Sequence, residues 1–178
     1  FNLFFKYLAC VANSCGLPQT MTELLLFTDG SVNPQSHGYG AYLAVPKLGL
    51  PLESLRTAVK VRRFDQTSST KLELQTLLWA LSEIGGSGTR VTVYTDSQNI
   101  VTLPARRARL EHFDYYTRKD QLHNNHELYR DFFRMTDRVD CQFVKVRGHR
   151  QAALKDEIDQ LFSLVDRAAR IALRQDSH

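Results

Sequence analysis

Five segments of the chain combine apolar runs or apolar and polar alternation with β-prone residues, a pattern that predicts strands. The predicted strands are Glu23–Asp29, Gly38–Val45, Thr57–Phe64, Arg90–Asp96 and Cys141–Val146. The first three follow one another closely, and turn-forming residues fill the loop after the first. This spacing predicts an antiparallel meander at the start of the domain.

Helical periodicity marks the remaining parts of the chain. The clearest predicted helix begins after an N-cap at Ser69 or Thr70 and stops at Gly85-Gly86. A second helix is predicted around His126–Arg138, and Pro104 should divide the segment between 97 and 125 into shorter helical pieces. A long amphipathic helix over Lys155–Arg174 should close the chain, with one apolar stripe made of Ile158, Leu161, Phe162, Val165 and Ala169.

The predicted order is β-β-β-α-β-α-α-β-α, which indicates an α/β domain with a five-stranded mixed sheet and helices on both faces. A chain of 178 residues has the length of one such domain. Residues 1–20 carry an apolar start without an initiating methionine, and we interpret them as an N-terminal extension outside the core. Residues 21–178 should form the domain, with Met21 as a plausible natural start.

The charge and the cysteine content of the chain indicate what kind of partner and compartment to expect. The formal charge of +4 and pI near 9.1 are mild, but they suit a polyanionic partner. Three cysteines without CxxC spacing indicate neither a disulfide framework nor a structural zinc site. Lys6 and Asn13 interrupt the apolar start, so no membrane span is expected there. We expect a cytoplasmic protein.

Three carboxylates occupy positions that suggest chemistry. Asp29 and Asp96 each end a predicted strand, within FTDGS and YTDSQ, and Glu73 lies in the first turns of the clearest helix. Simpler interpretations remain open: Asp-Gly is a common turn, and Glu73 can be a favourable charge at a helix start. If the three converge, they repel, and a hard divalent cation such as Mg²⁺ or Mn²⁺ would offset that repulsion. Two such ions could activate a water for phosphodiester hydrolysis.

Four motifs together resemble the ribonuclease H family, type 1, in its bacterial form. The motifs occur in the order and approximate spacing of that family, and they cover about residues 24–174. They are FTDGSVNP with HGYGAYL, STKLELQTLLWAL, VYTDSQNIV, and VKVRGH with VDRAARIAL. The resemblance implies the ribonuclease H-like fold and a role for Asp29, Glu73 and Asp96 as ligands of catalytic magnesium ions.

The resemblance also implies a fourth carboxylate and a histidine. His149 in RGH is similar to the family's mobile histidine, which is thought to assist proton handling or product release. The fourth ligand could be Asp159, by its distance from His149, or Asp166, by its setting in VDRAARIA. Both lie in one helical run, about 10.5 Å apart along the axis, and cannot bind the same ion. We favour Asp166, because its local sequence resembles the family's last helix, and expect Asp159 to be a solvated or capping residue.

Substrate contacts follow from the same resemblance. Gln98 matches the residue that contacts the minor groove of an RNA/DNA hybrid, and Asn33 resembles the asparagine of the first substrate loop. We expect Ser31, two residues before Asn33, to contact the substrate as well. Ser69 and Thr70 stand where many relatives have an asparagine pair. Pro104–Lys119 is basic and lies where the family has its basic protrusion, so we expect phosphate contacts there from Arg106, Arg107 and Arg109. A solvated basic helix is the alternative.

The predicted function is therefore a metal-dependent endonuclease that hydrolyses the RNA strand of RNA/DNA hybrids and leaves 3′-hydroxyl and 5′-phosphate ends. Two Mg²⁺ ions, for which Mn²⁺ could substitute, would be bound together with the substrate. The partner would be the hybrid duplex, with no membrane, and the enzyme would be a monomer. The alternatives are a nuclease or polymerase-associated domain of this fold that acts on DNA, and a non-catalytic hybrid-binding module.

Overall fold

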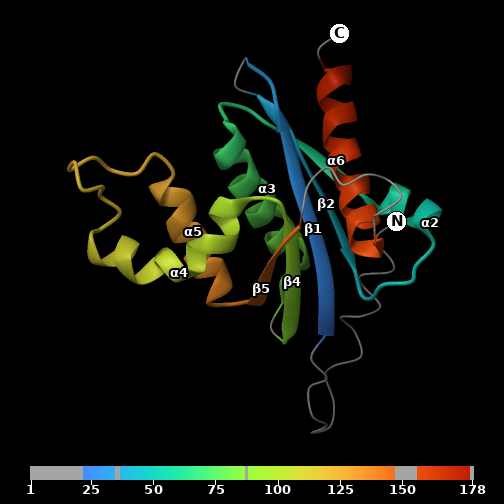
Figure 1. Ribbon diagram of the computed structural model, residues 1–178, viewed down its shortest axis with the longest axis horizontal. Coiled ribbons are helices and arrows are strands. Elements are labelled where there is room, and N and C mark those ends of the chain that lie inside the picture. The colour runs from blue at the N-terminus through green and yellow to red at the C-terminus, as the bar shows by residue number, and fades with distance from the viewer. Residues whose placement is uncertain (1–21, 35–36, 87, 147–155, 177–178) are drawn as a thin grey trace, which may run out of the picture.

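A computed structural model describes residues 22–34, 37–86, 88–146 and 156–176 of the chain. The described residues form five strands and five helices, and Figure 1 labels all of them except β3. The strands are β1 (Thr22–Val32), β2 (Gly38–Val45), β3 (Lys60–Phe64), β4 (Thr89–Thr95) and β5 (Asp140–Lys145). The helices are α2 (Leu52–Ala58), α3 (Ser69–Ile84), α4 (Gln98–His112), α5 (His126–Thr136) and α6 (Glu157–Gln175).

The strands form one mixed sheet in the order β3-β2-β1-β4-β5. β1, β2 and β3 pair antiparallel as the predicted meander, whereas β4 lies parallel to β1 and β5 parallel to β4. The parallel strands are connected through helices, as this geometry requires. The predicted five-stranded mixed sheet is therefore confirmed.

Helices cover both faces of the sheet, and the alternation of side chains along β1 explains which residues meet which helices. Leu26 packs with residues of α3, α4 and α5, whereas the adjacent Phe27 packs with residues of α2 and α6. Figure 1 shows these two groups of helices on opposite sides of the strands. Burial on both faces is the reason that β1 begins as a continuous apolar run.

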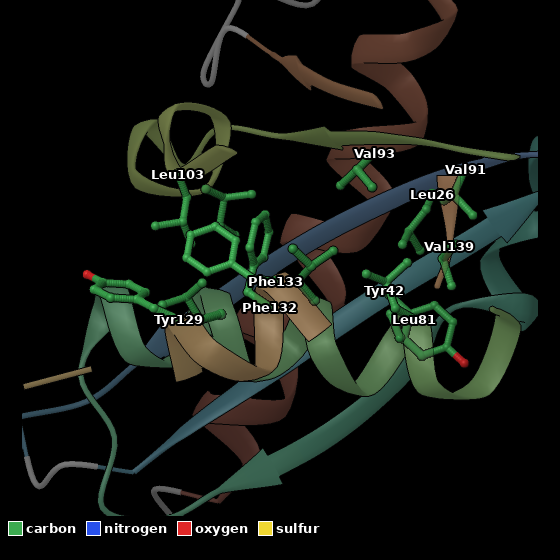
Figure 2. Close-up of a cluster of buried hydrophobic side chains, with 14 of the residues drawn as sticks. Leu26, Tyr42, Leu81, Val91, Val93, Leu103, Tyr129, Phe132, Phe133 and Val139 are labelled. Atoms are coloured by element: carbon green, nitrogen blue, oxygen red, sulfur yellow. The ribbon is translucent and has the colours of Figure 1, made fainter. Parts of the chain in front are cut away.

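The larger core lies between the sheet and the α3, α4 and α5 layer. Phe132, Phe133 and Tyr129 of α5 contact this core together with Leu103 of α4, as Figure 2 shows. The smaller core lies under α6, whose Val165 is completely buried. The apolar stripe predicted for the last helix faces this core.

The sequence prediction was wrong between 52 and 59. Thr57 and Ala58 belong to α2, a helix that the prediction missed, and β3 begins only at Lys60. α2 spans two turns, and Leu55 is its only buried side chain, so it has no repeated apolar period to detect. Pro51 at its N-cap and Glu53 in its first turn are the only local signals.

Pro104 does not divide the following helical segment, which is a second error. α4 runs without interruption from Gln98 to His112 and contains Pro104. Pro104 lacks the backbone N–H that would donate within the helix, but Leu103 before it and Leu110 after it in the sequence are both buried. Tertiary packing of these leucines therefore outweighs the local cost of the proline.

The helix ends differ from the predictions by small amounts. The N-cap of α3 is Ser68, one residue before the predicted Ser69, and Gly85 ends the helix as expected. α6 begins at Glu157, with the side chain of Asp156 accepting a hydrogen bond from the amide of Asp159. The proposed extension, residues 1–20, and His149 lie outside the described residues. No described helix combines the length and apolarity needed to cross a membrane.

Candidate active site

Asp29 lies where β1 loses one of its two neighbouring strands. The last pair between β1 and β4 is Phe27 with Tyr94, while β1 continues beside β2 as far as Val32. The alternative interpretation of Asp29-Gly30 as a turn was wrong, because both residues pair with β2. Asp29 therefore lies within β1, beside the open space left where β4 ends, and alternation directs it to the α6 face with Phe27.

Asp96 enters the same space from the end of β4. The adjacent Ser97 is buried and caps α4, because its hydroxyl accepts a hydrogen bond from the amide of Ile100. This cap fixes the point at which the chain leaves the strand and begins the helix. Asp96 itself remains exposed.

Glu73 reaches the site from the first turns of α3. Its carboxylate accepts a hydrogen bond of 2.5 Å from the hydroxyl of Ser97 and a weak one of 3.5 Å from Ser69. Burial raises the pKa of Glu73, Ser97 lowers it, and the charge of Asp96 raises it. Sequence reasoning missed Ser97, although a serine directly before a predicted helix is a typical capping signal.

Asp166 reaches the site from α6, on the opposite side of the sheet from α3. Asp166 lies close enough to Asp29 to raise the pKa of Asp29, and Arg170, one helical turn later, forms an ion pair with Asp166 at 2.8 Å. Arg170 also lines the cavity and was not predicted. A charge-opposite residue four positions after a candidate ligand on a helix is the signal that could have found it.

Asp159 does not line this cavity. Its side chain is buried, with 8% of the residue exposed, so our expectation of a solvated residue was wrong. Asp156, and not Asp159, supplies the helix cap. Between the two candidates for the fourth carboxylate, the structure brings only Asp166 to the other three.

The four carboxylates share a cavity of about 300 Å³. Its lining consists of Asp29, Gly30, Ser31, Val32, Ser69, Glu73, Asp96, Phe162, Ser163, Asp166 and Arg170. Asp96 and Asp166 act electrostatically on Asp29, and Asp96 acts on Glu73. The carboxylates thus form a row of interacting pairs, and among the described residues no three acidic, histidine or cysteine side chains converge on one point.

Asp29 is the most perturbed group of this row. Burial, the charge of Asp96, and the charge and hydrogen bond of Asp166 raise the pKa of Asp29 to about 8, although the Gly30 amide lowers it. With this raised pKa, Asp29 holds a proton at neutral pH when no cation is bound. A divalent cation would replace that proton, and an all-oxygen donor set fits Mg²⁺ or Mn²⁺.

The predicted substrate residues surround the cavity to different degrees. Ser31 and Ser69 line it, while Thr70 is exposed in the first turn of α3. Gln98, the first residue of α4, accepts a hydrogen bond from Nζ of Lys145 at the end of β5. Asn33 follows β1 in the loop to β2.

The three arginines that we expected to contact phosphates differ in how many contacts they make with other protein groups. Arg107 pairs with Asp137 and Glu111 and lies over the ring of Phe133. Arg106 donates a hydrogen bond of 2.8 Å to Asn99. Arg109 is exposed on α4, which makes it the most accessible of the three.

Comparisons with known proteins identify the family to which the chain belongs. The sequence model of the RNase H family matches residues 21–170. The chain is similar to the Ribonuclease H of Syntrophomonas wolfei, with 26% identity over 79% of this chain and 94% of that protein. It is also similar to the Ribonuclease H of Moorella thermoacetica, with 28% identity over 87% of this chain and 96% of that protein.

Solved structures share the fold at low identity. LC9-RNase H1, described as a type 1 RNase H with the type 2 active-site motif, superposes with a TM-score of 0.60 at 17% identity, over 89% of this chain and 74% of that one. The RNase H domain of PFV superposes with a TM-score of 0.63 at 15% identity, over 83% and 92%. A foamy viral protease-reverse transcriptase in complex with RNA/DNA hybrid gives 0.64 at 14% identity, over 90% of this chain but 21% of that larger chain.

Proposed function

Because this chain belongs to the RNase H family of hydrolases acting on RNA/DNA hybrids, we propose that it cuts the RNA strand by metal-dependent hydrolysis and leaves 3′-hydroxyl and 5′-phosphate ends. The observation that carries the metal-dependent part is the cavity that gathers four carboxylates from β1, α3, α6 and the end of β4. Their repulsion is relieved only partly within the described residues, since the pKa of Asp29 is about 8.

In this proposal Asp29, Glu73, Asp96 and Asp166 hold the cations. Two bound divalent ions would supply an activated water and stabilise the leaving oxygen. Ser97 orients Glu73 through its hydroxyl, and Arg170 restrains Asp166 along α6. His149, by its motif, remains a proposed proton-handling residue.

Recognition of the hybrid is proposed to come from Ser31, Asn33, Ser69, Thr70 and Gln98. Lys145 donates a hydrogen bond to the side-chain amide oxygen of Gln98, so the amide hydrogens of Gln98 are available to donate to the substrate. Minor-groove base edges and 2′-hydroxyl groups offer acceptors for such a donor, and the 2′-hydroxyl distinguishes RNA from DNA. Arg109, with Arg106 and Arg107, is proposed to contact phosphates. The cytoplasmic and monomeric states remain predictions.

A cleavage assay with three duplexes tests the proposal. Labelled RNA/DNA hybrid, double-stranded RNA and double-stranded DNA are incubated with the protein, with and without Mg²⁺. Cleavage confined to the RNA strand of the hybrid, and dependent on Mg²⁺, is the expected result. Cleavage of DNA would instead support a DNA-directed nuclease, and binding without cleavage would support a hybrid-binding module.

A further inference from the structure

The end of α6 contacts both β3 and the loop between β1 and β2. Asp176, the C-cap residue of α6, accepts hydrogen bonds of 3.0 and 2.8 Å from Nη1 of Arg63. It also lies 3.1 Å from Nε2 of His37, at the end of that loop. The side chains of Asp176 and His37 are only 24% and 19% exposed. This contact is therefore better shielded than an ordinary surface ion pair.

His37 in turn holds Asn33. The amide of His37 donates to Oδ1 of Asn33 at 3.2 Å, and the amide of Asn33 donates to the carbonyl of His37 at 2.9 Å. Nδ2 of Asn33 lies 3.0 Å from Nδ1 and 2.8 Å from Nε2 of the His37 ring. With the ring proton on Nε2, His37 donates to Asp176 through Nε2, and Nδ1 is the ring nitrogen left to accept from Nδ2 of Asn33 at 3.0 Å.

These contacts join the loop to the helix that carries Asp166. Ser31 and Val32, directly before Asn33, line the carboxylate cavity. Asp166 and Asp176 are separated by ten positions, about 15 Å along a helix. A single rigid element therefore reaches the cavity at one point and the loop at another.

We propose that Asp176 is a positioning residue that, through His37, fixes Asn33 and its loop for contact with the hybrid. This inference rests on the proposed function, in which Asn33 touches the substrate. Asp176 does not itself reach the cavity. Its loss should weaken hybrid binding and leave the chemical step intact.

The test compares Asp176→Ala with Asp65→Ala in the full chain. Asp65 is a matched control, because it also accepts from Arg63, at 3.0 Å, but makes no ion pair with the described part of the loop. Asp176→Ala should raise KM for the hybrid about threefold to tenfold, the effect of removing one or two hydrogen bonds, with kcat within about twofold. Asp65→Ala should leave KM and kcat unchanged.

Two further measurements separate positioning from a general loss of stability. Hydrogen exchange at the Asn33 amide should be faster in Asp176→Ala than in Asp65→Ala, whether or not the protein is active. The effects of His37→Ala and Asp176→Ala on KM should be non-additive.

Equal KM values and equal Asn33 exchange rates for Asp176→Ala and Asp65→Ala would overturn the inference, as would a fall in kcat at unchanged KM. An inactive wild-type protein would contradict the proposed function instead, while the exchange rates would still report whether Asp176 holds the loop.

Discussion

The carboxylate cavity gathers groups of like charge, whereas the outer surface of α4 and α5 pairs groups of opposite charge. In the cavity, burial and the charges of Asp96 and Asp166 raise the pKa of Asp29 to about 8. On the outer surface, Arg107 pairs with Asp137 and Glu111, and Arg130 pairs with Asp114. These pairings raise the pKa of Arg107 and lower that of Asp137, so both groups are stabilised in their charged forms.

The difference teaches where to look for a ligand. A paired surface has its electrostatic requirements met by the protein, whereas a group of like charges held together by the fold gains from a bound ion of opposite charge. The following predictions test this distinction, beginning with the largest effect.

Asp29→Asn should abolish hybrid cleavage, because an amide keeps the shape of the carboxylate but loses the charge that holds a cation. A loss of about 1,000-fold or more in kcat is expected, since metal-ion stabilisation is worth several kcal/mol. Single-turnover cleavage of labelled hybrid measures it. Glu53→Gln on α2, far from the cavity lining, is the control, and normal turnover of Asp29→Asn at saturating Mg²⁺ would refute the role of Asp29.

Asp166→Asn should lose most Mg²⁺-dependent cleavage, whereas Asp159→Asn should retain it. Only Asp166 lines the cavity. Because Asp159 is buried, its replacement should be assayed below the melting temperature of the variant, so that loss of folding is not mistaken for loss of chemistry. The reverse ranking of the two variants would contradict the placement of α6 relative to the family motif.

Mg²⁺ should raise the melting temperature, and more strongly at high pH. Since the folded pKa of Asp29 is raised to about 8, its stabilising contribution is present below the unfolded pKa near 4 and is lost as pH rises through 8. Without Mg²⁺, stability should therefore fall between about pH 4 and pH 8. At 100 times its Kd, Mg²⁺ should add about 2.7 kcal/mol, or roughly 5 to 10 °C. Differential scanning fluorimetry from pH 5 to 9 measures both effects, and Asp29→Asn should flatten the profile.

Replacing Arg106, Arg107 and Arg109 by alanine should weaken hybrid binding and reduce its salt dependence by about one unit of slope for each phosphate that is no longer neutralised. Fluorescence anisotropy at several salt concentrations measures this. The single variants separate an arginine that makes ion pairs within the protein from one that is exposed. Arg109→Ala should change binding with little change in melting temperature, whereas Arg107→Ala should cost stability of about 1 kcal/mol or less because its ion pairs are removed. An unchanged salt slope in the triple variant would mean that this helix face is only solvated.

Long helices and strands were predictable from the sequence, because the apolar residues that they bury recur at regular intervals along the chain. α3 and α6 show this, and the apolar run at the start of β1 likewise predicted a strand. α2 and the continuity of α4 through Pro104 were not predictable, because they depend on packing against distant residues. β1 extends beyond Asp29 because it pairs with β2 as far as Val32. The sequence did not predict this extension, since Asp-Gly locally favours a turn.

For the site, motif spacing anticipated that Asp29, Glu73, Asp96 and Asp166 would line one cavity. It could not supply Ser97 as the partner of Glu73 or Arg170 as the partner of Asp166, because both contacts arise from tertiary geometry. The burial of Asp159 is a similar case, since its position near the start of a helix suggested exposure.

Three glycines set how closely α3 can approach the sheet. A Cβ atom at Gly30 or Gly38 would lie 2.8 Å from the side chain of Leu72, and one at Gly40 would lie 2.0 Å from that of Thr76. An added methyl group would therefore require Leu72 or Thr76 to move, and both belong to the helix that carries Glu73. If α3 shifts in response, the separation of Glu73 and Asp96 changes through residues that carry no functional group. The affinity for the proposed cations would then change without any change of ligand.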